Sequence, residues 1–539
     1  MQVPLSVGRA LYAAGSLAND DAGFRFRLEC PLAGASLTRV VSVRVDESEI
    51  PVADLTLDLG DGRRLAVPDI TPEQPAPLVR RQAAWVSARA GHLVVGAHQL
   101  ALTLDVAPFG RVEVQAQDTI GAAAAPADDP PAEAAAPAPA APTATAAAPA
   151  TPHIPYDKDP TRNYGPEVVA ERQRFVEQFT GMRPQHIAHY SFDPAITRGN
   201  CENFTGVAQI PLGIAGPLRV NGEHAQGEFL IPLATSEGTL VASYNRGMKV
   251  LNLSGGVTCT VSEDYMQRAP VFIFDSAREA RTFRDWIVAH LDDLRREAEA
   301  TSHVAKLATV EVYLANKFAF LRFDFTTGDA AGQNMVGRAT YAACEWILAN
   351  APDVRRFYLE SNFATDKKVS HVNFLRTRGK RVTAEATIPR QVLHDELRVD
   401  PETLAFHAGV ANVGAFLSGA TNNGLHAPNA ITAMFIATGQ DVANVTEGSA
   451  AVIYTEMVPS GDLYLSITIP SLIVATHGGG TGLATQRECL EMLGCWGKGK
   501  VNKLAEIVAG VVLAGEISLA AAISSLEWVS AHEKMGRKR

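Results

Sequence analysis

The sequence predicts an α+β protein with an N-terminal all-β domain, a linker, and a larger region that mixes helices and strands. Three observations support this fold class. Apolar and polar residues alternate along much of the first 118 residues, the next segment is mainly Ala and Pro, and helix-like and strand-like segments alternate through the rest. The 539 residues are enough for about three or four domains.

Residues 1–118 are expected to form a small β-sandwich. Segments in which every second residue is apolar are typical of half-buried strands. The clearest such segments are FRFRLEC (24–30), RVVSVRVD (39–46), HQLALTLDV (98–106) and RVEVQAQ (111–117). They carry no catalytic constellation, so we expect an interaction or assembly domain whose partner the sequence does not identify.

Residues 119–153 are predicted to be a disordered, semi-rigid linker. In the segment 121–152, 25 of the 32 residues are Ala or Pro, and proline removes helix donors and favours an extended chain. The region 154–539 then alternates predicted helices (277–300 and 337–351) with predicted strands (319–325 and 463–470), which indicates a mixed α and β enzyme.

Composition excludes several classes of function. The chain is 47% hydrophobic, has a net charge of −10 and shows no basic stripe, which argues against nucleic acid as a partner. Its six cysteines lack CxxC spacing, so they predict buried thiols in a reducing compartment rather than disulfides or a metal site. The apolar segment from Ile507 contains Glu516 and three serines, so it predicts a buried helix rather than a membrane span. We expect a soluble, cytoplasmic protein.

The segment SNFATDKKVSHVNF (361–374) places Asp366, Lys367 and Lys368 side by side among uncharged residues. Its composition is that of a loop or strand end that meets an anion. Adjacent ammonium groups would bind an anion that satisfies both, one pairing a carboxylate while the other polarises a carbonyl. The alternative is a surface loop with an ordinary ion pair.

Two acids elsewhere are candidate functional groups. Glu237 lies between a strand-like run and a probable helix, where desolvation would raise its pKa and make it a proton donor; a solvated or capping residue is the alternative. Asp441 follows an apolar helix, which is typical of a carboxylate held inside and paired with a lysine, although N-capping competes.

Two glycine-rich segments, TTGDAAGQNMVGRAT (326–340) and HGGGTG (477–482), lack the Rossmann fingerprint. The first lies between a predicted strand and a predicted helix, where free backbone N–H groups bind phosphate. The second indicates a close approach of two backbones. His532, in the charged C-terminal tail, has no function that its own surroundings suggest.

Together these segments resemble the 3-hydroxy-3-methylglutaryl-coenzyme A (HMG-CoA) reductase family, in a soluble prokaryotic form with an extra N-terminal domain. The resemblance covers about residues 160–535, and residues 1–118 match nothing associated with the family. It rests on eight motifs whose order and spacing fit: ENFTG (202–206), PLGIAGPL (211–218), ATSEG (234–238), NRG (245–247), GDAAGQNM (328–335), TDKK (365–368), GQD (439–441) and GGGT (478–481).

This resemblance implies a four-electron reduction of HMG-CoA to mevalonate, through a hemithioacetal and mevaldehyde. Lys367 would polarise the carbonyl, Glu237 would donate protons, Asp441 would hold Lys367 charged and oriented, and His532 would protonate the departing thiolate. The resemblance also implies that the substrate carboxylate and its polar network involve Arg268, Asp366, Lys368 and Asn429, and that coenzyme A lies along Ser243, Asn245 and Arg246.

The implied cofactor site combines three segments: Ser302 and His303; Asp329, Ala330, Ala331, Gly332, Gln333, Asn334 and Met335; and Gly479, Gly480 and Thr481. Family members that use NADPH often carry an arginine where His303 stands. No acid there would repel the 2′-phosphate, so NADPH is expected, with NADH possible. The resemblance also implies a large domain around a central helix, an inserted ferredoxin-like cofactor domain at about 270–358, and a homodimer or dimer of dimers with active sites between subunits.

Other hypotheses remain open at this stage. The same residues would serve the reverse direction, NAD-dependent oxidation of mevalonate in its catabolism. From the lysine pair alone, a Schiff-base lyase that uses Lys367 is conceivable, and it would need no nicotinamide. A non-enzymatic scaffold is disfavoured, because all four candidate catalytic residues are present.

Overall fold

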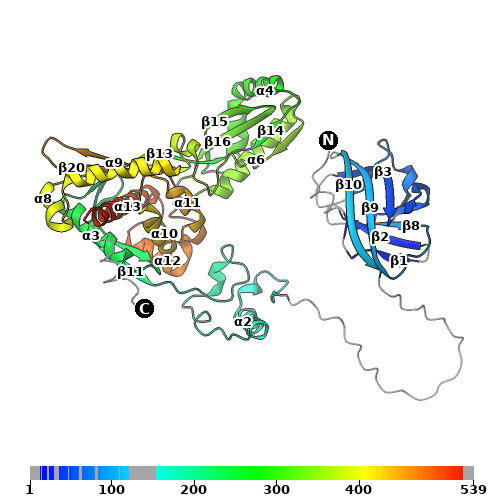
Figure 1. Ribbon diagram of the computed structural model, residues 1–539, viewed down its shortest axis with the longest axis horizontal. Coiled ribbons are helices and arrows are strands. Elements are labelled where there is room, and N and C mark those ends of the chain that lie inside the picture. The colour runs from blue at the N-terminus through cyan, green and yellow to red at the C-terminus, as the bar shows by residue number, and fades with distance from the viewer. Residues whose placement is uncertain are drawn as a thin grey trace, which may run out of the picture. The chain divides into compact units, whose positions relative to one another are not determined.

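A computed structural model describes residues 153–525 without a gap. In the N-terminal part it describes residues 12–13, 15–20, 23–29, 35–46, 48–59, 63–78, 83–107 and 110–120. The chain divides into two compact units, Met1–Thr145 and Ala146–Arg539 (Figure 1).

The N-terminal unit contains two antiparallel sheets, ordered β1-β2-β8-β5-β6 and β10-β9-β3-β4, with β7 pairing β3. Two 3-10 turns, Val52–Asp54 and Val67–Asp69, follow β4 and β6. The strands are β1 (Ala18–Asp20), β2 (Gly23–Glu29), β3 (Ala35–Val45), β4 (Ser48–Ile50), β5 (Leu55–Asp58), β6 (Arg64–Ala66), β7 (Ala76–Leu78), β8 (Ala83–Ala88), β9 (Gly96–Ala107) and β10 (Gly110–Ile120).

Both sheets contribute to one hydrophobic core, which explains why the apolar residues alternate along their strands. Phe26 and Leu57 of the first sheet and Leu102 and Val112 of the second belong to this core, and their polar neighbours in sequence face outward. The prediction of an N-terminal β domain is confirmed. Strand β10 ends at Ile120, two residues into the expected linker, and residues 121–152 lie outside the described residues.

His98 joins two loops of this unit. Its Nδ1 lies 2.8 Å from Asp46 Oδ2 and its Nε2 lies 2.8 Å from the Val94 carbonyl oxygen. Both partners are acceptors, so an imidazolium that donates from both nitrogens satisfies them. The Val94 carbonyl, and then the Asp46 carboxylate, raise the pKa of His98 above its ordinary value.

The second unit is a mixed α and β region, as predicted. Its strands are β11 (Leu212–Gly222), β12 (Gln226–Ala234), β13 (Val257–Arg268), β14 (Val271–Ile273), β15 (Lys306–Ala315), β16 (Phe318–Thr326), β17 (Arg356–Tyr358), β18 (Gly379–Ile388), β19 (Val452–Met457) and β20 (Leu463–Leu472). Its longer helices are α2 (Pro166–Thr180), α3 (Leu240–Leu253), α4 (Ala277–Ala289), α5 (Leu291–Glu299), α6 (Gln333–Asn350), α9 (Pro401–Ser418), α10 (Ala427–Thr438), α12 (Ala484–Met492) and α13 (Val501–Ser524).

Shorter helical segments connect these elements: α7 (His371–Leu375), α8 (Arg390–Val392), α11 (Val445–Gly448), the 3-10 turns Arg162–Tyr164, Pro194–Thr197, Val442–Asn444 and Gly479–Gly482, and a π-helical turn Leu393–Leu397. The helix predicted over 277–300 is two helices, because the chain breaks at His290 between α4 and α5.

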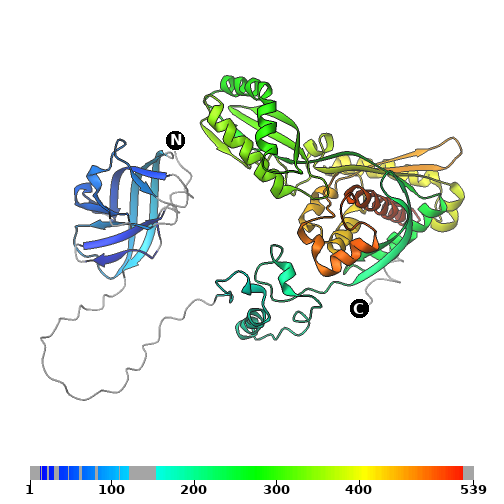
Figure 2. The same ribbon diagram turned by 180° about the vertical axis from the view of Figure 1, so that it is seen from behind.

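Helix α13 fills the centre of this unit. It packs on β11, β13, β18 and β20 and is flanked by α3, α9 and α10, as Figure 2 shows from behind. Among the described residues, α13 is the helix whose length and apolar composition would allow it to cross a membrane, but 78% of its most apolar window is buried inside the protein. The buried helix predicted from Ile507 is therefore confirmed, and it begins earlier, at Val501.

Two buried carboxylates on α13 bind backbone N–H groups. Glu506 accepts from Glu223, His224 and Ala225, in the turn between β11 and β12. Glu516 accepts from Leu425, His426 and Ala427, where α10 begins. Since buried charges require such partners, both glutamates fix where those two elements sit.

Strand β13 joins two parts of the sheet. Its first half lies between β11 and β18, whereas its last three residues, Met266–Arg268, pair with β16. From Val271 to Tyr358 the chain runs β14-α4-α5-β15-β16-α6-β17, with antiparallel strands in the spatial order β17-β14-β16-β15. This is a βαββαβ succession around a separate core that includes Phe272, Phe283 and Phe323.

The cysteines agree with the prediction in part. Cys259, Cys344, Cys489 and Cys495 are buried free thiols, but Cys201 is exposed; it lies in the turns that follow Pro194–Thr197, where its N–H donates to the Thr197 carbonyl oxygen. Cys30 lies outside the described residues.

We predict that the N-terminal unit loses stability as the pH rises. His98 has a folded pKa above the value of about 6.5 that it has in an unfolded chain, so its contribution is complete below that pH and disappears as the pH passes the folded pKa. Thermal unfolding of residues 1–125 between pH 6 and 9 measures this.

His98→Gln should flatten that pH dependence. The matched control is His92→Gln in the loop before β9, because His92 is exposed and its Nε2 lies 2.9 Å from a neutral acceptor, the Asp20 carbonyl oxygen. An unchanged slope in His98→Gln would contradict the prediction.

Candidate functional site

The segment with Asp366 and the two lysines is a loop between β17 and α7, as the sequence predicts. Three of its non-glycine residues have left-handed backbone conformations: Asn362 (φ 66°), Thr365 (φ 58°) and Lys367 (φ 59°). Such conformations cost energy in L-residues and persist where surrounding contacts enforce them. We call residues 361–368 the lysine loop.

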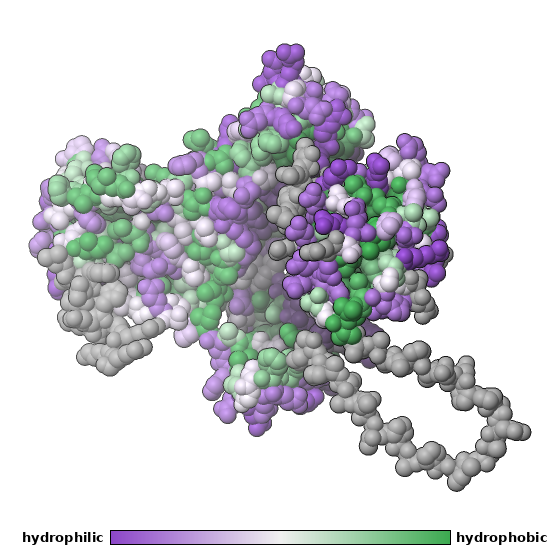
Figure 3. All heavy atoms as spheres, turned by 45° about the vertical axis from the view of Figure 1, so that its right-hand side comes forward, coloured by the Kyte–Doolittle hydropathy of each residue, from purple (hydrophilic) through white to green (hydrophobic). Residues whose placement is uncertain are grey.

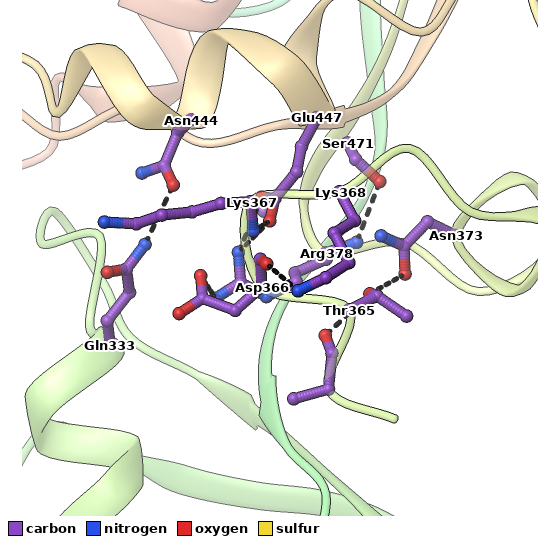
Figure 4. A network of polar contacts seen from close by, with 12 residues as sticks. Gln333, Thr365, Asp366, Lys367, Lys368, Asn373, Arg378, Asn444, Glu447 and Ser471 are labelled. Carbon is purple, nitrogen blue, oxygen red and sulfur yellow. Dashed lines mark hydrogen bonds and ion pairs between the residues drawn. The ribbon is translucent and has the colours of Figure 1, made fainter. Parts of the chain in front are cut away.

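A buried ion pair lies against the lysine loop (Figure 4). Arg378 Nη1 lies 2.6 Å from Glu447 Oε2 and 2.8 Å from Oε1, and both side chains are fully buried. Arg378 Nη2 also pairs with Asp366 Oδ1 at 2.8 Å, and Glu447 accepts the backbone N–H of Lys367. Burial raises the pKa of Glu447, while Arg378 acts in the opposite direction.

Lys367 and Asp441 meet as predicted. Lys367 Nζ lies 3.4 Å from Asp441 Oδ2, and both side chains are about half exposed, at 47% and 44%. Asp441 also caps the short turn Val442–Asn444, since Oδ1 accepts from Ala443 N at 3.0 Å. The lysine partner and the N-cap were alternatives, and both occur. The expectation of a carboxylate held inside is wrong, because Asp441 follows the end of α10 and faces open space.

Glu237 lies between β12 and α3, as predicted, but its side chain is exposed rather than partly desolvated. Asn429 Nδ2 lies 3.5 Å from Glu237 Oε1. Asn429 is in the first turn of α10, whereas Asp441 follows the other end of this 12-residue helix. Because an α-helix rises 1.5 Å per residue, the two ends are about 18 Å apart. One chain therefore presents the two acids at opposite ends of α10.

The residues expected around the substrate carboxylate already have partners. Arg268 Nη1 pairs with Glu360 Oε2 at 3.1 Å, and its Nη2 donates to the Gln333 carbonyl oxygen at 3.2 Å. Lys368 Nζ donates to the Asp366 carbonyl oxygen at 3.1 Å while its side chain stays exposed. Lys368 is thus a cation of the lysine loop, and Arg268 is a cation paired with Glu360, the residue directly before that loop. An anion would have to replace these contacts.

The turn that contains Gly439, in the motif GQD, touches the turn that contains Gly480, in the motif HGGGTG. A Cβ on Gly439 would lie 2.2 Å from the Gly480 carbonyl oxygen, and one on Gly480 would lie 2.6 Å from that of Gly439. Gln440 holds the same loop, since its Oε1 accepts from Ala475 N at 2.7 Å and its Nε2 donates to Ala475 O at 3.0 Å. The close backbone approach predicted for HGGGTG is therefore present.

These turns border a cavity of about 710 Å³, within the size range of ligand sites. Its other walls are residues 330–335 at the start of α6, residues 199–200, and Asp441 with its neighbours. Most of the predicted cofactor residues line it: Ala330, Ala331, Gly332, Gln333, Asn334, Met335, Gly479, Gly480 and Thr481.

Asp329 does not line this cavity. Its carboxylate accepts from Gly499 N at 2.8 Å and from Lys500 N at 3.0 Å, at the start of α13. Burial alone would raise the pKa of Asp329, but these backbone N–H groups lower it. Its contacts indicate a helix cap rather than a cofactor ligand. Ser302 accepts from Val304 N and Ala305 N, which shapes the turn that leaves His303 exposed.

The residues expected along coenzyme A lie on α3. Ser243 Oγ is 3.1 Å from Ser518 Oγ and 3.4 Å from His426 Nε2. Arg246 donates to Ser518 Oγ at 3.1 Å and to its carbonyl oxygen at 2.6 Å, and Asn245 accepts from Gly216 N at 2.9 Å. Burial lowers the pKa of His426 to about 4, so its imidazole is neutral at pH 7.

Four residues of this site were not predicted from the sequence: Arg378, Glu447, His426 and Ser518. Arg378 lies in the run RTRGKR and Glu447 in TEGS, where nothing local marks a buried charge. The absence of another charge near Glu447 in the sequence was the available signal, since a lone acid in an apolar stretch needs a partner. His532 lies outside the described residues.

Comparison with known proteins gives matches along both units. A sequence model of the family "Hydroxymethylglutaryl-coenzyme A reductase" matches residues 168–537. The 3-hydroxy-3-methylglutaryl-coenzyme A reductase of Pyrococcus abyssi is 46% identical over 375 residues, which cover 68% of this chain and 92% of that protein. The reductase of Methanothermobacter thermautotrophicus is 43% identical over 388 residues, or 71% and 95% of the two chains.

The fold is similar to a solved structure, that of the class II 3-hydroxy-3-methylglutaryl-CoA reductase from Streptococcus pneumoniae bound to NADPH. The TM-score is 0.50 at 19% identity, over 66% of this chain and 94% of that one. In addition, the model "Hydroxymethylglutaryl-CoA reductase, N-terminal domain" matches residues 7–121. This corrects the expectation that residues 1–118 match nothing in the family. The alternation of apolar and polar residues, on which that expectation was based, is common to β-sandwiches in general.

We predict that Gly439→Ala damages the cavity and the stability of the second unit. Its φ of +71° and the 2.2 Å approach to Gly480 leave no room for a methyl group, so the free energy of unfolding should fall by about 2–5 kcal/mol. The matched control is Gly482→Ala in the adjoining turn, where an added Cβ meets nothing within 4 Å. Chemical denaturation compares them, and equal stability of the two variants would contradict the proposed contact.

Proposed function

The chain belongs to the hydroxymethylglutaryl-coenzyme A reductase family, and on this basis we propose that it reduces HMG-CoA to mevalonate and coenzyme A, the biosynthetic direction, with hydrides from NADPH. The observation that carries the proposal is the pair of Lys367 with Asp441 beside the cavity that the glycine motifs enclose. Mevalonate oxidation is not favoured, because the relatives reported above are named as reductases.

Lys367 is the proposed electrophilic group. Hydride addition to a thioester or aldehyde places negative charge on the carbonyl oxygen, and a fixed ammonium stabilises that charge as it develops. Asp441, 3.4 Å from Nζ, favours the charged form of the lysine and limits where Nζ can lie. Arg268 and Lys368 are proposed to receive the distal carboxylate of the substrate, with Asp366 and Asn429 completing the polar network.

Glu237 and His532 are the proposed proton donors. The two reductions consume protons, at the aldehyde oxygen and at the departing thiolate. Glu237 is proposed to protonate the aldehyde oxygen, and His532 is proposed to protonate the departing thiolate. Glu237 is held in place by the backbone turn in which Glu237 N donates to Thr235 Oγ1 at 3.0 Å and by Asn429.

The cavity fits a nicotinamide dinucleotide in size and lining. Backbone N–H groups at the start of α6 suit a pyrophosphate, and the Gly439–Gly480 contact keeps the opposite wall free of side chains. When bound, NADPH would supply the hydrides. Ala330–Met335 and Gly479–Thr481 would hold it, with Ser302 and His303 near the 2′-phosphate, and the S. pneumoniae reductase that shares this fold was solved with NADPH.

The remaining domain assignments are proposals of the same kind. We assign residues 154–539 as the catalytic region, the βαββαβ unit at about 270–358 as a ferredoxin-like cofactor domain inserted in it, residues 119–153 as a linker, and residues 1–118 as an accessory domain. A cytoplasmic location is also proposed, which the buried free thiols of the second unit support.

We propose that the enzyme is a homodimer, or a dimer of dimers, with each active site shared between subunits. Glu237 with Asn429 and Lys367 with Asp441 lie at opposite ends of α10 in one chain, so two chains are needed to bring Glu237 next to Lys367. Apolar side chains reach the surface in patches (Figure 3), and α9 exposes Phe406, Phe416 and Leu417 by more than three quarters each. Covering this face would bury the exposed apolar area.

The reaction is tested by following absorbance at 340 nm with HMG-CoA and either NADPH or NADH. We expect oxidation with release of coenzyme A, faster with NADPH. Lys367→Ala and Glu237→Gln should lower turnover by about a hundred- to ten-thousand-fold while the protein stays folded. Normal turnover in either folded variant would refute its role, and no oxidation by the intact protein would refute the reaction.

Shared sites are tested by mixing the two inactive variants. A heterodimer of Lys367→Ala with Glu237→Gln has one site with both residues intact, so unfolding and refolding them together should restore up to about a quarter of wild-type turnover, the value for random pairing into dimers. The control is each variant refolded with itself. If the mixture stays inactive although mass spectrometry shows heterodimers, each site draws both residues from one chain.

A further inference from the structure

We infer that Glu447 is a positioning residue for Lys367: the buried Arg378–Glu447 ion pair sets the backbone of Lys367, and thereby the place of its ammonium group. The sequence comparisons assign no role to either residue. The inference deepens the proposed reductase function and depends on it for its kinetic test, but not for its structural test.

One short segment, residues 441–448, holds Lys367 at two points. Asp441 and Glu447 begin and nearly end the segment 441–448, which consists of the turn Val442–Asn444 and α11. Asp441 contacts the ammonium group at 3.4 Å, while Glu447 accepts the backbone N–H of the same lysine. A long, flexible side chain that is fixed at both ends has little freedom to misplace its charge.

The backbone of the lysine loop has a conformation that needs support from outside the loop. Lys367 has a φ of 59° and Thr365 a φ of 58°, conformations that L-residues adopt where other contacts enforce them. Thr365 Oγ1 donates to Asn373 Oδ1 at 3.1 Å, and the bond from Lys367 N to Glu447 holds the other position. Without Glu447, nothing in this part of the described chain would hold the Lys367 N–H in that direction.

The Arg378–Glu447 ion pair is itself anchored to the central sheet. Arg378 directly precedes β18, and its backbone N–H donates to Ser471 Oγ of β20 at 3.3 Å. The neighbouring Thr377 donates to the Pro470 carbonyl oxygen at 2.6 Å. Arg378 then reaches both Glu447 and Asp366, so one guanidinium connects the sheet, the 441–448 segment and the lysine loop (Figure 4).

The chemical type of both residues fits this role. Both carboxylate oxygens of Glu447 lie within hydrogen-bond distance of one guanidinium nitrogen, Arg378 Nη1, and charge-assisted contacts of this kind are among the strong ones. A fully buried carboxylate also has no solvent to turn toward. Neither group reaches the cavity, since the residues that line it include neither Arg378 nor Glu447. Glu447 would therefore act through Lys367 rather than on the substrate.

The test compares Glu447→Gln with a matched control in full-length enzyme. Glu447→Gln keeps the size of the side chain but places an amide against Arg378. Asp264→Asn removes the partner of another buried cation, since Lys380 is 3% exposed and its Nζ lies 2.9 Å from Asp264 Oδ1. Strand β13, which carries Asp264, meets the lysine loop three residues further on, where Gln267 Nε2 donates to the Ala364 carbonyl oxygen, so this control lies on a strand that supports the loop but leaves that contact in place. Both variants break an ion pair that involves a buried cation, but only the first lies at the lysine loop.

We expect Glu447→Gln to lower kcat by about 10- to 100-fold, the effect of misplacing a catalytic group by about 1 Å. The loss should be equal for HMG-CoA and mevaldehyde, because Lys367 polarises both carbonyls, and the Kd for NADPH should stay unchanged. Asp264→Asn should keep kcat within about threefold. A kcat in Glu447→Gln equal to that of Asp264→Asn, or a matching loss of NADPH binding, would overturn the inference.

Hydrogen exchange of peptides that span 361–368 gives a result that does not depend on activity. Glu447→Gln should speed exchange in these peptides, and Asp264→Asn should not. Unchanged exchange overturns the inference even if the protein proves to catalyse another reaction. Should Glu447→Gln not fold, Glu447→Asp keeps the charge beside Arg378 but shortens the reach to Lys367 N. Faster exchange in the same peptides would then support the inference, and unchanged exchange would overturn it.

Discussion

Two buried carboxylates on α13 are the constraint on which the second unit depends. A carboxylate inside a protein is stable only when hydrogen-bond donors replace its water, and Glu506 and Glu516 each receive three backbone N–H groups. Burial raises the pKa of Glu516 and the N–H groups oppose this. The central helix thus specifies, through charge, where the β11–β12 turn and the start of α10 must lie.

The candidate site follows from these two anchors. The hairpin held by Glu506 includes β12, which leads directly to Glu237, and the helix held by Glu516 carries Asn429 near its start and Asp441 beyond its end. The lysine loop is held separately, by Arg378, which is anchored to β20 through Ser471, and by Glu447. Three separate supports therefore hold the proposed catalytic groups, which is how a protein keeps exposed charges in fixed positions.

The exposure of these charges has a consequence for assembly. Lys367 and Asp441 are about half exposed, and Glu237 is exposed as well. Exposed charges interact weakly with one another and with a substrate, because water screens them. Covering the site with a second chain and with substrate would remove that water and strengthen each interaction, which agrees with the proposed sharing of the site between subunits.

The sequence by itself determined part of the secondary structure, because apolar periodicity reflects burial directly. The alternating segments in 1–118 are strands, and the apolar segment from Ile507 is a buried helix, but the break at His290 between α4 and α5 was not predicted. The sequence also identified the family and the pair of Lys367 with Asp441, since short motifs keep their order along the chain. Tertiary structure alone decided that Asp329 caps α13, that Glu237 and Lys367 lie at opposite ends of α10, and that Arg378 and Glu447 pair beneath the lysine loop. Those facts depend on contacts between residues 69 to 192 positions apart, and local sequence carries no record of which distant partner a side chain will meet.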